Sequence, residues 1–188
     1  MGRMAYPDPK SVPAAVQALL DARPPRNVFR MLAHAPALMP GLMELTGAIL
    51  YRATLDPVLR ELVILRVGHL CGSSYEVHQH RKISQAVGIA QAKIDGTAKD
   101  ADPALYDARE LVVLQLAEQV VRKVKADDGL FFEAVRTLGN ELTMEVLVVI
   151  GLYVMLAQVL ENAEVALEEG GGPSQDAVSE IFGGQAKK

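Results

Sequence analysis

Residues 56–88, DPVLRELVILRVGHLCGSSYEVHQHRKISQAVG, decide the fold, because they predict two helices joined at a short Gly-Ser corner. Asp56 followed by Pro57 is a helix-start signal, since Asp caps free backbone N–H groups and Pro needs no N–H partner in the first turn. Apolar residues then fall on nearly every side as far as Cys71, which is typical of a helix surrounded by protein. We therefore predict that the first helix lies in the core.

One carboxylate, Glu61, interrupts this apolar helix. A carboxylate in an apolar interior loses hydration worth several kcal/mol unless it is paired, hydrogen-bonded or protonated. Arg60 and Arg66 are near enough in sequence to be considered as partners, but neither shares its helix face. The sequence therefore predicts a buried Glu61 and leaves its partner open.

The second helix has polar residues on its inward face. Gly72 ends the first helix, and the S-x-x-E spacing of Ser73 and Glu76 predicts a capping box that begins the second. Steps of about 100° per residue give a largely apolar inward arc. This arc also contains the polar residues Ser73, Glu76, His80 and Ser84. Because Glu76 and His80 are four residues apart, their side chains can touch, and we expect Glu61 beside them.

Two conspicuous residues fall outside this inward arc. His78 lies on the opposite, polar arc and is predicted to be a solvated surface residue. Cys71 is predicted to be a small buried hydrophobic residue at the end of the first helix. The rings of His78 and His80 point to different sides of the helix, so a shared metal ion would require a broken helix. We predict no metal site.

Each inward residue also has an explanation that involves no chemistry. Ser73 with Glu76 could act only as a helix cap, and an inward histidine is often a hydrogen-bonded core residue. Glu61 could hold neighbouring backbone or an arginine. Tyr153, in a later apolar helix, could line a pocket or pack in the core with a bonded hydroxyl.

Composition and charge exclude several classes of protein. The chain has 188 residues, 50% of them hydrophobic, and a formal net charge of -4. Its Lys and Arg residues are scattered, so no nucleic-acid partner is expected. A single Cys excludes an internal disulfide framework and fits a reducing compartment, and the first ten residues lack an apolar signal-peptide core. We therefore expect a cytoplasmic protein.

The hydrophobic pattern predicts an all-α fold. The longest apolar run, residues 146–157, is shorter than the roughly 18 residues of a membrane span, so it predicts a buried helix and no membrane partner. Helix signals also predict helices at residues 11–20, 27–33, 41–51, 104–125, 130–138 and 141–168, with a helical turn at 91–97. Asn27 is expected to cap its helix, Asp102-Pro103 to open the 104–125 helix, and Gly139-Asn140 to separate the last two. The prediction is a single-domain bundle of six to eight helices.

Three segments are predicted along the chain. Residues 1–35 are expected to form a helical wrapper, residues 36–169 the main domain, and residues 170–188 a flexible tail after a run of glycines. Two helices that are apolar nearly all round are more than one small subunit can bury. We therefore expect a homo-oligomer.

The central residues resemble the carboxymuconolactone decarboxylase family, which also contains the alkylhydroperoxidase D proteins. RELVILRV is followed by SSYEVHQH, which begins twelve residues after Glu61, and the similarity extends over about residues 36–168. The resemblance implies an oligomeric, all-helical fold of the alkylhydroperoxidase D type, with the site on such a helix pair. It also implies a small organic acid or lactone as substrate, with no metal or organic cofactor.

The register of the motif separates two branches of this family. The peroxidase branch has a buried Glu, then C-x-x-C-x-x-x-H twelve residues later. Placing the first cysteine position at Cys71 puts a leucine where the Glu should be, whereas placing it at Ser73 fills the other positions with Glu61 and His80. Ser73 and Glu76 then stand at the two cysteine positions, so thiol redox cycling is not expected.

The motif Tyr-Glu-Val-His-Gln-His is similar to the Tyr-Glu-Trp-x-x-His of cysteine-less members. For the decarboxylase proper, the resemblance implies loss of CO₂ from a small lactone carboxylic acid, which requires an acid that protonates carbon. We predict His80 as that acid, paired to Glu76, with Glu61 relaying or tuning the proton. Ser73 and Tyr153 are predicted to contact the substrate.

Two alternatives to a lyase of decarboxylase or isomerase type stay open. The scaffold could carry a non-catalytic small-ligand-binding or assembly protein. It could also carry an alkylhydroperoxidase D-like peroxidase, which the missing C-x-x-C disfavours and which would have to act through Cys71.

Overall fold

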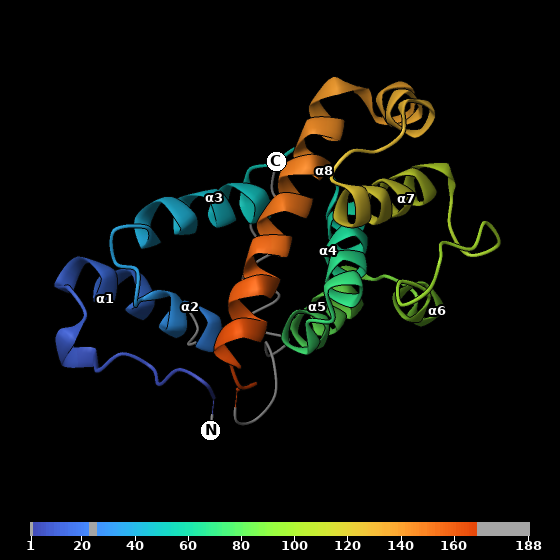
Figure 1. Cartoon of the computed structure of the whole chain (residues 1–188). Helices are drawn as coiled ribbons and strands as arrows, with labels where there is room; N and C mark the ends of the chain where they lie inside the picture. The colour runs from blue at the N-terminus through green and yellow to red at the C-terminus, as the bar shows by residue number, and fades with distance from the viewer. Residues whose placement is uncertain (1, 23–25, 169–188) are drawn as a thin grey trace. The chain divides into compact units, whose positions relative to one another are not determined.

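The computed structural model describes residues 2–22 and 26–168, and within them every regular element is helical (Figure 1). It contains one short 3-10 helix, η1 (Pro9–Ser11), and eight α-helices, which confirms the predicted all-α class. The chain divides into two compact units, residues 1–52 with 159–188 and residues 53–158. The predicted tail, residues 170–188, lies outside the described residues.

The first unit contains three helices before the main helix pair. These are α1 (Ala14–Asp21), α2 (Asn27–Leu32) and α3 (Met39–Tyr51). Its core cluster consists of Val16, Ala33, Met39 and Met43. The prediction that Asn27 caps α2 is wrong, because Asn27 is the first helical residue and its side-chain amide donates to the Ala166 carbonyl at 3.0 Å.

The second unit is built around α4 (Pro57–Cys71). It also contains α5 (Ser74–Val87), α6 (Gln91–Gly96), α7 (Ala108–Lys123) and most of α8 (Asp128–Ala163). Every α4 residue from 59 to 68 is buried, as the sequence predicts for a helix apolar on all sides. α4 packs most extensively on α5 and α7, between which it runs (Figure 1).

The ends of the central helices follow the sequence signals except at one cap. Asp56 accepts hydrogen bonds from the backbone N–H groups of residues 58 and 59, and Gly72 ends α4 in the left-handed region at φ 69°. The predicted capping box of Ser73 and Glu76 is wrong, since in the described part of the chain Ser73 makes no side-chain cap bond. The Ser73 backbone N–H already donates to the Gly68 carbonyl at 2.9 Å, so Glu76 is not needed to accept from it.

α7 begins later than predicted. Asp102-Pro103 forms a turn, and the helix opens at Asp107, whose carboxylate accepts from the Glu110 backbone N–H at 2.9 Å. Glu110 accepts in return from the Asp107 N–H at 2.8 Å. Two reciprocal bonds satisfy two free donors at once, which explains why this start prevails.

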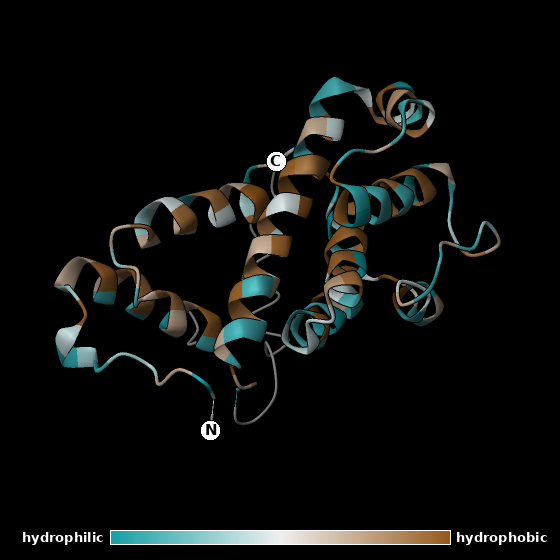
Figure 2. Ribbon diagram, viewed as in Figure 1, coloured by the Kyte–Doolittle hydropathy of each residue, from teal (hydrophilic) through white to brown (hydrophobic). Residues whose placement is uncertain are grey.

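α8 is interrupted where a break was predicted, and it stops earlier than predicted. Gly139 has φ 83° and ψ 168°, which are not helical values, so it separates two helices that share the label α8, and the predicted break is confirmed. The helix ends at Ala163, and Glu164 has φ 50°. By length and composition α8, whose hydropathy is drawn in Figure 2, could cross a membrane. The test is one of length and composition only, since core helices of water-soluble proteins also pass it, and 44% of the most apolar 18-residue window of α8 is buried.

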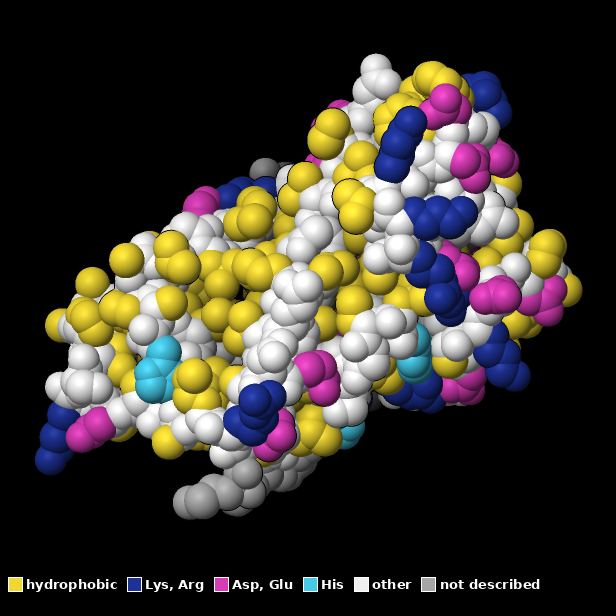
Figure 3. Space-filling view, viewed as in Figure 1, with side chains coloured by type: hydrophobic (Ala, Val, Ile, Leu, Met, Phe, Trp, Pro, Cys, Tyr) yellow, Lys and Arg dark blue, Asp and Glu magenta, His cyan; other side chains and the backbone are white. Residues whose placement is uncertain are grey.

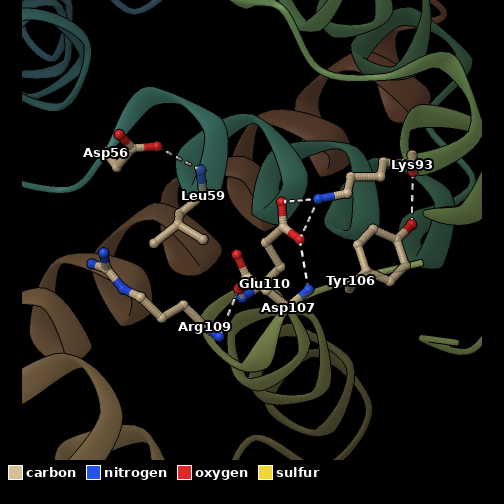
Figure 4. A network of polar contacts seen from close by, with 7 residues as sticks. All are labelled: Asp56, Leu59, Lys93, Tyr106, Asp107, Arg109 and Glu110. Carbon is tan, nitrogen blue, oxygen red and sulfur yellow. Dashed lines mark hydrogen bonds and ion pairs between the residues drawn. The ribbon is translucent and has the colours of Figure 1, made fainter. Parts of the chain in front are cut away.

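A polar network fixes α6 against the start of α7 (Figure 4). Lys93 Nζ donates to both carboxylate oxygens of Glu110, at 2.7 and 2.6 Å, and the Tyr106 hydroxyl donates to the Lys93 carbonyl at 2.6 Å. Glu110 is 4% exposed, so its two bonds to an ammonium group offset its burial. Burial, followed by the nearby Glu110 charge, raises the pKa of Tyr106, which keeps its hydroxyl a donor.

Replacing Gly96 by Ala should lower the free energy of unfolding by about 1–3 kcal/mol. An added Cβ would lie 2.5 Å from the Tyr106 hydroxyl oxygen, so the ring must move and weaken its bond to Lys93. Chemical denaturation measures the change. Gly151→Ala is the control, because among the described residues only its chain neighbours and its own helix backbone come near that Cβ position, and Ala favours the helix. Wild-type stability of the Gly96 variant would contradict the prediction.

Candidate active site

Four charged side chains meet where α4 packs on α5, and we call them the His80 cluster: Arg60, Glu61, Glu76 and His80. His80 Nδ1 lies 2.6 Å from Glu61 Oε2, and His80 Nε2 lies 3.4 Å from Glu76 Oε2. Arg60 Nε donates to Glu61 Oε1 at 3.3 Å. The structure therefore brings together the three residues predicted as catalytic and adds an arginine.

The local sequence explains why these groups meet. Because α4 is buried on all sides, the Glu61 carboxylate cannot reach water and must find a partner within the protein. Glu76 and His80 are one turn apart on α5, so they present one face to it. Gly68 lets the two helices approach, since an added Cβ would lie 3.1 Å from Val77 Cγ2 and 3.5 Å from Glu76 Cβ.

His80 is positively charged at neutral pH. Burial lowers the pKa of His80, but the Glu61 and Glu76 carboxylates raise it by more, so that the resulting pKa is about 9. Both ring nitrogens of the imidazolium are then donors. The short contact to Glu61 holds the Nδ1 proton tightly, and the longer contact to Glu76 leaves the Nε2 proton the easier one to transfer.

Tyr153, on α8, packs against the imidazole. Its ring centroid lies 5.0 Å from that of His80, with the two planes at 85°. Such an edge contact limits rotation of the imidazole without adding charge. Tyr153 therefore lies beside the cluster, and its predicted contact with a substrate stays a prediction.

Two buried serine hydroxyls lie on the inward face of α5. Ser73 and Ser84 are both 0% exposed, and among the described residues neither hydroxyl has a hydrogen-bond partner. A buried hydroxyl without a partner costs free energy, so each can gain by contacting a bound molecule or a water. Ser73 is the residue that the sequence predicts to contact substrate.

The residues that were set aside lie outside the cluster. Cys71 is half-buried, and burial raises the pKa of its thiol, which disfavours the reactive thiolate. The prediction that His78 is a solvated surface residue is wrong: it is half-buried, and within the described part of the chain its buried Nε2 has no partner. The polar arc of α5 is partly covered, because α6 packs on α5 and Arg81 donates to Asp95 at 2.5 Å.

The sequence left the partner of Glu61 open, and the structure supplies two: His80 at one carboxylate oxygen and Arg60 at the other. A helical wheel separates adjacent residues by about 100°, but a long guanidinium side chain can fold back along the helix. Arg66 serves a different purpose, because it donates to Glu118 at 2.6 Å and to the Thr97 carbonyl at 3.1 Å. The adjacent Arg-Glu pair within an apolar helix was the signal in the sequence, since two buried opposite charges seldom stay apart.

The cluster is almost closed to solvent. The side chains of His80 and Glu76 retain 8% and 6% of their surface, while Glu61 retains none. Two cavities, of about 180 Å³ in the first unit and about 460 Å³ beside α7, are lined by other residues. Among the described residues, no group of three or more His, Cys, Asp and Glu side chains is arranged to hold a metal ion.

These features define an all-α protein with a buried acid–base cluster between two central helices. Residues 36–119, which include both helices, match the carboxymuconolactone decarboxylase family, so the resemblance of the central residues to this family is confirmed. No curated protein matches the chain. The fold is similar to the crystal structure of an alkylhydroperoxidase AhpD core, an uncharacterized peroxidase-related protein from Ralstonia eutropha JMP134. The TM-score is 0.73, with 16% identity over 95% of each chain.

The charge on His80 predicts a pH dependence of stability. Its pKa is raised from 6.5 to about 9, so the folded state binds an extra proton between these values. This contribution is complete below about pH 6.5 and is lost as pH rises through about 9, a difference of roughly 3 kcal/mol. Urea denaturation over this range should show the free energy of unfolding falling more for wild type than for His80→Gln. Parallel pH profiles would contradict the assignment.

Proposed function

We propose that the His80 cluster is a cofactor-independent proton-transfer site that acts on a small organic acid or lactone, as a decarboxylase or an isomerase. The observation that carries this proposal is an imidazole held between two carboxylates, with Glu61 at 2.6 Å and Glu76 at 3.4 Å, in a nearly dry environment. A histidine that keeps one proton fixed while the other faces a second carboxylate can work as an acid and be recharged. The match of residues 36–119 to the carboxymuconolactone decarboxylase family supports this reaction class.

A decarboxylation at this site would proceed in two steps. The imidazolium supplies the positive charge beside which a substrate carboxylate is bound. The bond between that carboxylate and its ring carbon then breaks, CO₂ leaves, and the bonding electrons move into the conjugated lactone carbonyl. His80 Nε2 gives its proton to the carbon, and solvent returns a proton to the neutral imidazole.

An isomerisation would use the same groups in a different order. Glu76 Oε2 would take a proton from a carbon next to a carbonyl, and His80 Nε2, 3.4 Å away, would return one at another carbon. Ser73 and Tyr153 are the proposed substrate contacts. Ser73 supports this role because its buried hydroxyl has no partner in the described residues.

We also propose that the protein works as a cytoplasmic homo-oligomer without a nucleic-acid or membrane partner. Exposed apolar residues on one helix support an oligomer, namely Met144, Val148 and Met155 of α8. On the face drawn in Figure 3, Lys and Arg side chains are interspersed with Asp and Glu, which does not favour a polyanion.

Replacing His80 by Gln should abolish turnover of a true substrate, since the acid is lost while the side chain stays polar and similar in size. Small lactones and organic acids can be screened for CO₂ release, and for exchange of carbon-bound hydrogen with D₂O by NMR. His78→Gln is the matched control, because His78 lies two residues away outside the cluster and should retain activity. Full activity in His80→Gln with wild-type helix content would refute the proposal. Saturable binding that His80→Gln abolishes, without turnover by wild type, would favour the ligand-binding alternative.

The peroxidase alternative has its own test. Cys71 is the one cysteine, and its raised pKa disfavours the thiolate, so Cys71→Ser should leave any consumption of alkyl hydroperoxide unchanged. A coupled peroxide assay compares the two proteins. Peroxide consumption that disappears in Cys71→Ser would favour the peroxidase.

A further inference from the structure

Arg60 is the largest side chain that the described structure buries completely, at 1% exposure. Removing a guanidinium group from water is costly, and a hydrophobic residue of similar size often stabilises such a position better. Its presence in an otherwise apolar stretch of α4 is therefore not explained by packing alone.

The position of Arg60 connects it to the imidazole through one carboxylate. Glu61 accepts from Arg60 Nε with Oε1 at 3.3 Å and from His80 Nδ1 with Oε2 at 2.6 Å. Because the two oxygens of a carboxylate share one plane, holding Oε1 also fixes the direction of Oε2. The orientation of the His80 ring thus depends on a residue that does not contact it in these bonds.

The charges of the His80 cluster also connect Arg60 to the protonation of His80. The groups in contact with His80 are Glu61 from α4, Glu76 from α5 and the Tyr153 ring from α8, and Arg60 adjoins them through its bond to Glu61. Two carboxylates, a guanidinium and an imidazolium sum to zero, which is the least costly arrangement for buried charges. Without Arg60, the cluster would carry one net negative charge and would hold the imidazolium proton more tightly.

Arg66 provides an internal comparison. It lies on the same helix and is also buried, at 3% exposure. Its bonds go to Glu118, Asp100 and the Thr97 carbonyl, which lie on α7 and the α6–α7 connection. Arg66 therefore connects α4 to α7 and to the α6–α7 connection, whereas Arg60 donates to Glu61 of the His80 cluster.

We propose that Arg60 is a positioning residue, which holds Glu61 so that His80 Nδ1 stays fixed and Nε2 is the nitrogen that exchanges a proton with a bound molecule. This inference rests on the proposed function of the cluster, but it predicts properties that can be measured without a substrate. It assigns Arg60 a role in the site that a purely structural ion pair would not have.

The test is an NMR titration of the histidine rings. The chain has four His, and the His80 signal is the one absent from His80→Gln. Arg60→Met should move the midpoint of the His80 titration upward by about one pH unit, because a neighbouring positive charge is lost. Arg60→Lys keeps the charge but not the Nε donor, so the Nδ1 proton should exchange with solvent at least several-fold faster. Arg66→Lys is the control and should change neither quantity.

The outcomes separate this inference from the proposed function. If Arg60→Met does not fold, the rate at which the His80 Nδ1 proton of Arg60→Lys exchanges with solvent decides whether the inference holds. Unchanged midpoint and exchange in folded Arg60 variants would overturn the inference, even if wild type turns over a substrate. Where wild type has activity, Arg60→Lys should lower kcat more than it changes KM, and Arg60→Met should shift the alkaline limb of the pH profile. If the Arg60 variants alter the His80 titration but wild type shows no activity, Arg60 stays the positioning residue and the proposed reaction is rejected.

Discussion

The hydrogen bond between Glu61 and His80 is the interaction on which the arrangement of the central helices depends. α4 is buried on all sides, so its carboxylate has no route to water and loses several kcal/mol unless a partner is supplied. That partner comes from α5, at 2.6 Å, and the closeness requires Gly68 where the helices cross. Packing and chemistry are thus set by one contact: a change that separates α4 from α5 also leaves a buried charge unpaired.

The sequence predicts those features of the fold and the site that are determined within one helix. Helix ends at Asp56 and Gly72, and the shared face of Glu76 and His80, depend on spacing within one helix, and the structure bears them out. His78 is half-buried although it lies on the predicted polar arc of α5, and α6 packs on α5. No spacing within one helix indicates that a second helix will cover it.

Where two sequence signals for a helix start competed, the helix began at the one that forms more hydrogen bonds. Asp102-Pro103 offers one capping side chain, whereas Asp107 and Glu110 exchange two bonds, and α7 begins at the latter. At α5 the outcome is reversed, because Ser73 has already given its backbone N–H to Gly68 and the box does not form. Sequence patterns show which bonds are available, but the neighbouring turn determines which donors are still free.

That unused cap has a chemical consequence. Freed from the helix terminus, Glu76 lies beside His80 Nε2 at 3.4 Å and adds to the charge that raises the pKa of His80 to about 9. In the peroxidase register this position would hold a cysteine, which can transfer electrons and form a disulfide. A carboxylate can do neither, but it can accept a proton and stabilise a cation. In this chain Ser73 and Glu76 occupy the two cysteine positions, so the helix pair is suited to proton transfer. This chemical difference is the physical basis for the proposed reaction class.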